Sequence, residues 1–406
     1  MELPRSSVTR ATVILIALRV GYAYNWYDIG PGFVSIGQEF AVGPADWGLL
    51  TAAFLIGAGL LQVPAGLLAR RYGARSLSLW GAGLLAAAGI GSAVAPSYSI
   101  LLATRLVAGI GAALFFSPAI GLIASLYPPG HRGLPVGIFS SAFSAGAGLG
   151  ILASSLLIPD IGWRGAMAVG GILLGVLVVL AIALVPRAAG APSPSRSRAA
   201  RTLPAGLRYR GAWAIGFAFV GLEGATFATG QFIVPYGETI QGWSIALAGV
   251  VGMMFVLPSL AGGPVGGSMA ERHRNHRTQF VVATLLAAGV LAVVPIVGLA
   301  GAIVIGCIFS FSYGFVYAVM YVLPQFWREV PPDEIPLTIG LFNSIQLAGG
   351  AIVSFAFGFV VAATSYAIAW EALAGLVVVT LVALVALPPT VAAAVGPPDE
   401  AAPAPS

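Results

Sequence analysis

Apolar runs of about 20 residues or more recur along almost the whole of this chain, with only short polar breaks between them. A helix that crosses the hydrocarbon core of a bilayer needs about 20 apolar residues, and all its backbone hydrogen bonds are then made within the helix. The sequence therefore predicts an all-α integral membrane protein with twelve transmembrane helices. The predicted spans are 11–34, 46–69, 76–95, 99–125, 134–158, 164–186, 211–234, 244–270, 279–299, 301–325, 337–361 and 365–388.

The composition excludes most other classes of protein. Hydrophobic residues make up 58% of the chain and charged residues only 8%, whereas a soluble domain carries about 25% charged residues. A soluble enzyme and a disordered chain are both excluded, and a dispersed net charge of +5 gives no sign of nucleic-acid binding. The single Cys307 allows no disulfide within the chain. The histidines, His131, His273 and His276, lie in polar segments and are expected to be solvated, so no metal, cofactor or enzymatic activity is expected.

The arginines predict how the chain is oriented in the membrane. All 19 basic residues are arginine, and 16 of them fall on one side of an even-numbered topology. Basic residues concentrate in cytoplasmic loops, so both termini are expected in the cytoplasm and the protein is expected in the plasma membrane. The apolar segment that runs past Gly30 is expected to be the first span rather than a cleaved signal, because no cleavage site follows a short apolar core.

The two halves of the chain resemble each other at a nearly constant offset. Residues 137–141 (Gly-Ile-Phe-Ser-Ser) match 340–344 (Gly-Leu-Phe-Asn-Ser), and Gly146 matches Gly349 at the same offset of 203. We therefore predict two pseudo-symmetric six-helix bundles, a layout typical of secondary transporters with a site between the halves. The predicted divisions are an N-terminal bundle at 1–186, a cytoplasmic linker at 187–210, a C-terminal bundle at 211–388 and a flexible cytoplasmic tail at 389–406.

Two motifs resemble those of the major facilitator superfamily. Residues 66–75 read Gly-Leu-Leu-Ala-Arg-Arg-Tyr-Gly-Ala-Arg, close to the family's Gly-x-Leu-a-Asp-Arg-x-Gly-Arg-Arg, with Arg70 at the acidic position. A second copy at 267–274 does carry an acid, Glu271, and residues 105–113 resemble the family's Arg-x-x-q-Gly-x-Gly motif. The resemblance implies the twelve-helix fold of that family and transport by alternating access.

The first motif also suggests a gate on the cytoplasmic side. Its charges lie at helix ends, where they can interact with helix dipoles and with the opposite half. We hypothesise that an arginine of this motif pairs with an acid just before the eleventh span when that side is closed; alternatively, the arginines only set the orientation. The predicted gate residues are Gly66, Arg70, Arg71, Gly73, Arg75, Glu271, Arg272, Asp333 and Glu334.

Several ionisable residues fall inside the predicted spans, where an unpaired charge is costly and therefore points to function. Arg19 shares a helical face with Tyr22 and Trp26, and can bind an anion or pair with an acid as structural support. Burial favours the neutral form of a carboxylic acid, so Glu223 or Asp28 is a candidate carrier of a coupling proton. The residues expected at the substrate or at the coupling site are Arg19, Tyr22, Trp26, Asp28, Arg105 and Glu223.

Polar and aromatic residues of the spans are expected to line a cavity between the halves. Tyr313, Tyr317 and Tyr321 recur at every fourth residue of one span, a pattern typical of packing as well as of a binding site. Glu371, close to a span end, is expected to reach the interface as a structural acid. The expected lining residues are Asn25, Gln62, Ser141, Ser144, Gln231, Tyr317, Asn343 and Gln346.

These observations favour a secondary active transporter of a small solute. Two arginines within the bundle favour an organic or inorganic anion as cargo, and protons are expected to drive transport. The alternatives are proton-coupled efflux of amphipathic drug-like compounds and a membrane sensor that keeps this architecture without transport. An ATP-driven pump would need a phosphate-binding loop with a lysine, and the chain has none. The expected partners are the solute, protons and the lipid bilayer, and the chain is expected to be a monomer.

Overall fold

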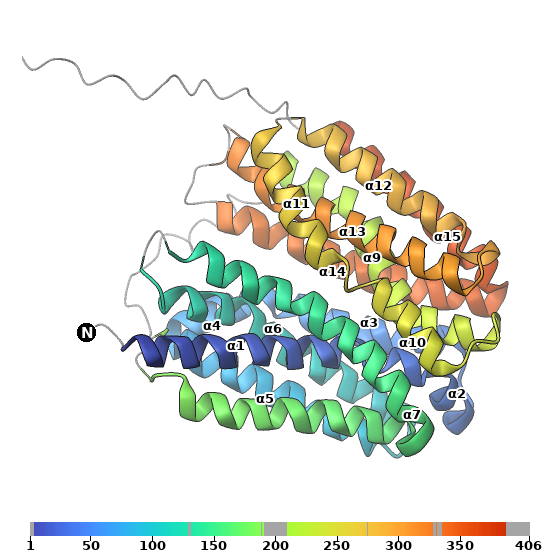
Figure 1. Ribbon diagram of the computed structural model, residues 1–406, viewed down its shortest axis with the longest axis horizontal. Coiled ribbons are helices and arrows are strands. Elements are labelled where there is room, and N and C mark those ends of the chain that lie inside the picture. Colours follow the sequence, from blue (N-terminus) through green and yellow to red (C-terminus); the bar gives the residue numbers. More distant parts are fainter. Residues whose placement is uncertain are drawn as a thin grey trace, which may run out of the picture.

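The computed structural model describes residues 4–128, 131–187, 189–190, 209–273, 275–327, 330 and 335–386, and their regular secondary structure is helical throughout. The first half forms α1 (Arg5–Tyr27), η1 (Gly30–Gly32), α2 (Phe33–Phe40), α3 (Pro44–Leu60), α4 (Gln62–Tyr72), α5 (Ala74–Ala93), α6 (Tyr98–Ser125) and α7 (Gly133–Leu184). The second half forms α9 (Arg210–Thr239), α10 (Ile245–Met254), α11 (Ser259–Arg272), α12 (His276–Ala292), η2 (Val294–Ile296), α13 (Leu299–Val322), η3 (Leu323–Phe326), α14 (Ile335–Ala363), α15 (Tyr366–Thr380) and η4 (Leu381–Ala386). Figure 1 shows the two halves as two groups of helices, here called the first and second lobes.

The helices of the described residues account for twelve membrane crossings, as predicted. Nine segments are long and apolar enough to span a bilayer by themselves, one of them comprising α10 and α11 together. The 52-residue α7 bends sharply and supplies two crossings, and α1 and the α3–α4 pair supply the remaining two. An even number of crossings returns η4 to the side where α1 begins. We call this the terminal side and the opposite one the distal side.

A glycine allows α7 to reverse direction without a loop. The spans expected at 134–158 and 164–186 follow each other directly, because Gly162 has φ 68° and ψ 171° in the middle of the continuous helical stretch. Residues with a side chain rarely adopt a positive φ, so glycine permits this sharp turn on the distal side. Two other spans are interrupted: α3 gives way to α4 at Leu61, and α10 is separated from α11 by residues 255–258.

Reciprocal glycine contacts join equivalent helices within each lobe. In the first lobe, a Cβ atom on Gly57 would collide with a backbone carbonyl of α6, and one on Gly109 would collide with a backbone carbonyl of α3. In the second lobe, Gly262 and Gly314 make the same two contacts between α11 and α13, each 205 residues further along the chain. Small residues allow membrane helices to approach at backbone distance. The same crossing is therefore built twice, as the internal repeat predicts.

The predicted repeat pair Gly146 and Gly349 also occupies equivalent contacts. Gly146 of α7 packs against the backbone of Val20 in α1, and Gly349 of α14 packs against the side chain of Val220 in α9. The offset of 203 residues found in the sequence therefore corresponds to one structural role, which is the close approach of a lobe's fifth helix to its first.

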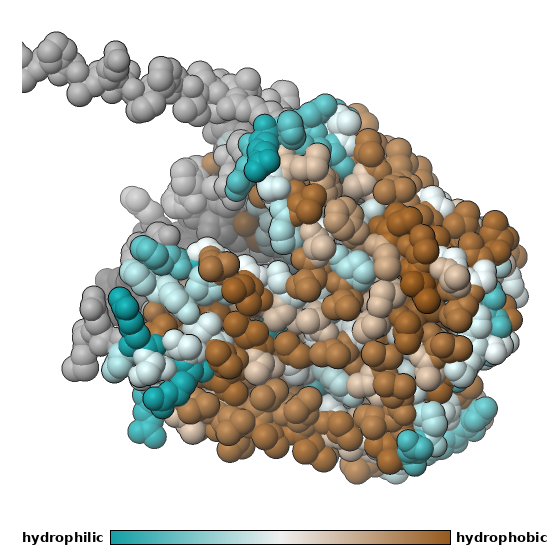
Figure 2. Space-filling view, viewed as in Figure 1, coloured by the Kyte–Doolittle hydropathy of each residue, from teal (hydrophilic) through white to brown (hydrophobic). Residues whose placement is uncertain are grey.

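The two lobes meet over their distal halves and enclose space on the terminal side. On the distal side, η1 packs against α9, and the starts of α3 and α10 pack against the ends of α14 and of the first segment of α7. Toward the terminal side, a cavity of about 600 Å³ lies between α1 and α7 of the first lobe and α11 of the second. Figure 2 shows an apolar belt around the body between two more polar ends, as expected for a bilayer-spanning protein.

One expectation about the loops is wrong. His276, expected to be solvated, begins α12 and is only 1% exposed, and its Nε2 lies 2.7 Å from the carbonyl oxygen of Ala270. The ring is buried because α12 starts directly beside the last turn of α11, where carbonyl groups lack partners within the helix. His131 and His273 are exposed, and so is Glu371, near the start of α15.

Candidate functional site

Arg19 is a buried cation surrounded by aromatic rings. Its side chain leaves the residue only 5% exposed, and its guanidinium carbon lies 4.4 Å from the ring centre of Phe116, 4.7 Å from Tyr22, 4.8 Å from Phe143 and 5.5 Å from Phe139. The Nε and Nη1 atoms have no hydrogen-bond partner, and no described carboxylate forms an ion pair with this guanidinium. The aromatic faces compensate part of the charge, but two strong donors remain unused.

A column of tyrosine hydroxyls faces Arg19 from the second lobe. Tyr317 and Tyr321 of α13 are close enough to Arg19 to interact with its charge. The Tyr317 hydroxyl donates to Tyr321 over 3.0 Å, and Tyr321 donates over 2.9 Å to Oδ1 of Asn343 on α14. The same Oδ1 accepts a hydrogen bond from Gln346. The polar ends of the tyrosine stripe therefore form one connected network, and the stripe does more than fill space.

Glu223 lies in the middle of α9, beside this column. It is 4% exposed, and its Oε2 accepts a hydrogen bond of 2.9 Å from the hydroxyl of Tyr313, the first tyrosine of the stripe. The described residues provide no basic partner within ion-pair distance. A buried carboxyl group with a single neutral donor can hold a proton without breaking an ion pair.

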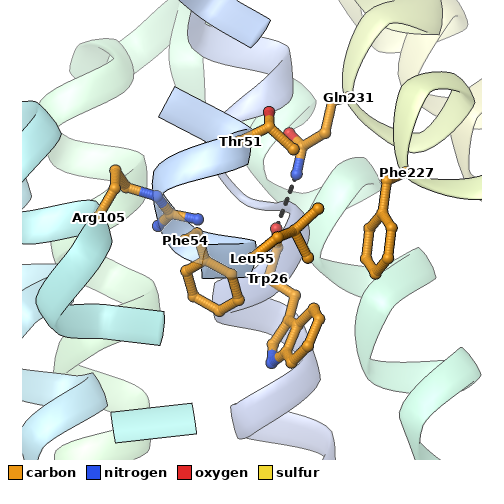
Figure 3. A pocket seen from close by; sticks show the side chains of 7 residues that line it. All are labelled: Trp26, Thr51, Phe54, Leu55, Arg105, Phe227 and Gln231. Carbon is orange, nitrogen blue, oxygen red and sulfur yellow. Dashed lines mark hydrogen bonds between the residues drawn. The ribbon is translucent and has the colours of Figure 1, made fainter. Parts of the chain in front are cut away.

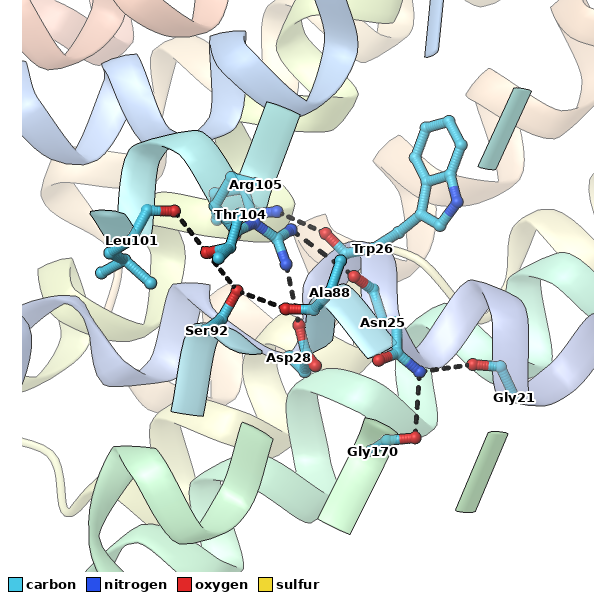
Figure 4. A network of polar contacts seen from close by, with 11 residues as sticks. Gly21, Asn25, Trp26, Asp28, Ala88, Ser92, Leu101, Thr104, Arg105 and Gly170 are labelled. Atoms are coloured by element: carbon cyan, nitrogen blue, oxygen red, sulfur yellow. Dashed lines mark hydrogen bonds and ion pairs between the residues drawn. The ribbon is translucent and has the colours of Figure 1, made fainter. Parts of the chain in front are cut away.

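Asp28 and Arg105 form a buried ion pair inside the first lobe (Figure 4). Arg105 Nη1 lies 3.7 Å from Asp28 Oδ1, and both side chains are almost fully inaccessible, at 1% and 0%. Neither carboxylate oxygen of Asp28 accepts a hydrogen bond from a described residue. Arg105 also points its Nη2 at the carbonyl oxygen of Asn25, 3.5 Å away, and lies 4.7 Å from the ring of Phe54. The pair is thus held by charge, with few directed bonds.

Asn25, expected to line the cavity, is instead used within the first lobe. Its Nδ2 donates to the carbonyl oxygens of Gly21 in its own helix and Gly170 in α7, over 2.8 and 3.1 Å (Figure 4). A Cβ on Gly89 of α5 would lie 2.8 Å from the Oδ1 atom. Asn25 therefore ties three helices of one lobe together, because its position on α1 points away from the second lobe.

Gln231 bridges the two lobes at the distal end of the site. Its Nε2 donates over 2.8 Å to the carbonyl oxygen of Trp26, and Phe227 lies on the same face of α9. Figure 3 shows these residues around a small enclosed pocket, which is also lined by Thr51, Phe54, Leu55 and Arg105. The pocket brings the Asp28–Arg105 pair close to the contact between the lobes.

The remaining expected lining residues lie at different depths. Ser144 of α7 accepts a 2.8 Å hydrogen bond from Ser259 of α11, another contact between the lobes. Ser141 lines the 600 Å³ cavity, whose other walls are apolar except for backbone groups. Gln62 begins α4 and is 8% exposed.

The expected gate is described only in part. Arg75 donates from Nε and Nη2 to the carbonyl oxygens of Val185 and Ile182, over 3.0 and 2.7 Å, so it caps the end of α7 in its own lobe. Gly73 has φ 87° in the turn between α4 and α5. Asp333, Glu334 and the side chain of Arg70 lie outside the described residues, so pairing between the lobes stays a prediction.

Other gate residues are at the surface of the terminal side. Arg71 is exposed and its guanidinium carbon lies 5.3 Å from the ring centre of Tyr72. Glu271 and Arg272 are exposed at the end of α11, and a Cβ on Gly66 would meet no other atom. These residues are free to change partners when the terminal side closes.

An exposed ion pair fastens the distal turn of the first lobe. Arg164 Nη2 lies 2.6 Å from Glu39 Oε1, and Trp163 Nε1 donates over 2.8 Å to Glu39 Oε2. Arg164 also donates to the carbonyl oxygens of Ala93 and Ala95. The hydrogen bonds from Arg164, with a smaller contribution from Trp163, hold the pKa of Glu39 below its usual value. This cluster connects α2, the α5–α6 turn and the bend of α7.

The sequence analysis overlooked the aromatic residues around Arg19 and at the lobe contact. Phe139 and Phe143 are four residues apart on α7, and this spacing places both on the face of one helix. In a chain rich in apolar residues, that signal does not stand out against ordinary packing. Phe227, on the other lobe, is recognisable only by its contacts.

Comparisons with known proteins agree with this architecture. The sequence model of the Major Facilitator Superfamily matches residues 15–354. The "Probable nitrate/nitrite transporter NarK2" of Mycobacterium tuberculosis is 26% identical over 255 residues, which cover 61% of this chain and 63% of that protein. The "Gallate transporter" of Pseudomonas putida is 26% identical over 217 residues, 53% of this chain and 48% of that protein.

A solved structure resembles the whole chain. A bacterial homologue of the human lysosomal transporter Spinster, in an inward-facing and occupied conformation, superimposes with a TM-score of 0.74 at 18% identity. The match covers 94% of this chain and 96% of the other. The matched segments span between 26% and 63% of the first curated relatives, so those relatives extend beyond the matched part.

Proposed function

We propose that this chain, which belongs to the Major Facilitator Superfamily, is a secondary transporter that binds a small anion at Arg19 and carries it across the membrane by alternating access. The family consists of transporters rather than enzymes. Multi-pass insertion in the membrane follows from the fold, and the bias of arginines to the terminal side supports cytoplasmic termini.

The buried, unpaired guanidinium of Arg19 carries the proposal. A charge removed from water is normally paired, because leaving it alone is costly. Four aromatic faces offset part of that cost, and Nε and Nη1 remain unsatisfied. An anion entering from the terminal side would accept hydrogen bonds from these donors and from the hydroxyls of Tyr317 and Tyr321 opposite. Relatives named for nitrate, nitrite and gallate, all of them anions, support this class of cargo.

Coupling to protons is the second part of the proposal. Asp28 and Glu223 are both buried carboxyl groups, one held by a single long ion pair and the other by a single hydroxyl donor. Burial favours the protonated form of each, and protonating Asp28 would release Arg105. Either group can therefore exchange a proton as the cavity changes the side to which it opens.

A second candidate cargo is an amphipathic compound exported against protons. The largely apolar cavity of about 600 Å³ between α7 and α11 favours it, since apolar walls suit an apolar ligand. The two candidates predict opposite ligand preferences.

Thermal unfolding of the purified protein distinguishes the two candidates. Nitrate and gallate are added at constant ionic strength, and a cationic amphiphilic dye is tested in parallel. A ligand at 100 times its Kd stabilises by about 2.7 kcal/mol. We expect the anions to stabilise the wild type and the control Arg164→Gln, which removes an exposed charge, but not Arg19→Gln. Stabilisation by the dye alone would reject the anion proposal.

A further inference from the structure

The contact between α1 and α9 is the place where the two lobes are most specifically joined. Gln231 is 1% exposed and donates its Nε2 hydrogen over 2.8 Å to the carbonyl oxygen of Trp26. Phe227, one turn earlier on α9, stacks on Trp26 at 5.9 Å and 20°, and on Tyr27 at 6.1 Å and 13°. We call these four residues the distal clasp (Figure 3).

The clasp lies where equivalent positions of the two halves face each other. Tyr27 and Phe227 are 200 residues apart and stack ring on ring. At the same offset, a Cβ on Gly30 would lie 2.7 Å from the amide oxygen of Gln231, and one on Gly230 would collide with the ring of Tyr27. Each lobe therefore presents a glycine to the other's side chain. Such mutual contact places the clasp on the axis that relates the lobes, where relative rotation begins.

The clasp has one polar bond, and only one half supplies its donor. The position equivalent to Gln231 is Pro31, which has neither an amide side chain nor a backbone N–H. The acceptor, the Trp26 carbonyl, belongs to the last turn of α1, where carbonyl groups lack an intrahelical partner. The hydrogen bond thus satisfies an acceptor that would otherwise be buried without a donor.

The neighbouring carbonyl connects the clasp to the buried ion pair. Asn25, directly before Trp26, presents its carbonyl oxygen 3.5 Å from Nη2 of Arg105, and the ring of Phe54 packs against both Arg105 and Trp26. The end of α1 is therefore held by Arg105 from its own lobe and by Gln231 from the other.

We propose that Gln231 is the positioning residue that keeps the distal side closed, and that its bond to the Trp26 carbonyl must break each time the cavity opens to that side. This inference rests on the proposed alternating access, but it does not depend on what the cargo is. Losing one hydrogen bond between neutral groups should raise the ratio of distally open to closed molecules about two- to tenfold.

Distances between spin labels test the inference in the full-length protein. Labels are attached at Gln38→Cys and Ile240→Cys, two exposed distal positions on different lobes, in a Cys307→Ser background. A second pair, Gln38→Cys with Asp160→Cys, lies within the first lobe and reports its integrity. The measurements are made without any added anion, so a failure of anion binding at Arg19 does not affect them.

The variants separate the amide bond from general packing of α9. Gln231→Leu removes the donor at similar volume, and Gln231→Asn shortens the side chain so that it no longer reaches the carbonyl. Thr229→Val is the control, since Thr229 is equally buried on α9 but bonds only within its own helix. We expect both Gln231 variants to shift the interlobe distances to longer values while the control keeps the wild-type distribution. Wild-type distances in both Gln231 variants, or the same shift in Thr229→Val, would overturn the inference.

Discussion

The buried pair of Asp28 and Arg105 can be tested quantitatively. The side chains are 0% and 1% exposed, and the charged atoms lie 3.7 Å apart. At an effective dielectric constant of about 20, two unit charges at this separation attract each other by roughly 4 kcal/mol. Removing one charge leaves the other buried alone. We therefore expect Asp28→Asn or Arg105→Met to lower the free energy of unfolding by about 3–5 kcal/mol.

The double variant separates the ion pair from the packing around it. It carries neither charge, so it loses only hydrogen bonds and contacts, and we expect it to lie within about 2 kcal/mol of the wild type. The coupling energy between the two sites should then be at least about 2 kcal/mol. The same cycle on Glu39 and Arg164, which are 41% and 33% exposed, serves as the control and should give less than about 1 kcal/mol.

Unfolding in mixed detergent–SDS micelles, followed by tryptophan fluorescence, measures these energies. All four proteins of each cycle are compared at one pH and one ionic strength. If the losses of the two single variants simply add in the double variant, the two charges do not interact and the argument is refuted. A double variant less stable than either single one would refute it as well.

Three further predictions concern other parts of the molecule. Because Arg164 lowers the pKa of Glu39, the stability advantage of the wild type over Glu39→Gln should be constant above about pH 4.5 and vanish as the pH falls through the folded-state pKa; melting midpoints from pH 7 to pH 3 would contradict this if the advantage grew in acid. Gly109→Ala should lower the free energy of unfolding by about 1–3 kcal/mol, whereas Gly83→Ala, with open space around it, should not; equal effects would count against the close crossing of α3 and α6. If Glu223 carries the coupling proton, Glu223→Gln in proteoliposomes should transport at a rate that no longer responds to a pH gradient, and an unchanged response would exclude that role.

Hydropathy was sufficient to predict the helices and their number. A bilayer leaves few options for a backbone, so the apolar runs alone determine where α5, α6 and α13 lie. The repeat was also readable, because close helix crossings require small residues and Gly146 and Gly349 are conspicuous at a fixed offset. The bend at Gly162 was predicted as a break between spans, but its lack of a loop depends on one backbone angle.

Partners were much harder to predict than elements. The sequence identifies Asp28 and Arg105 as costly charges, yet their pairing depends on how α1 packs against α6. Gln231 was expected to line a cavity, and its bond to a carbonyl of the other lobe follows from the distance between α1 and α9 alone. Composition and periodicity specify which residues a helix presents on each face, and they do not specify which helix lies opposite.

The paired glycines of α3 and α6, and of α11 and α13, have a consequence for how such a chain diversifies. They fix the architecture of each lobe through backbone contacts, on helix faces away from Arg19 and its aromatic neighbours on α1 and α7. Mutations that retune cargo preference therefore act on side chains that the scaffold does not need. A lineage built on this plan can acquire new solutes by drift at the cavity while its glycine crossings stay unchanged.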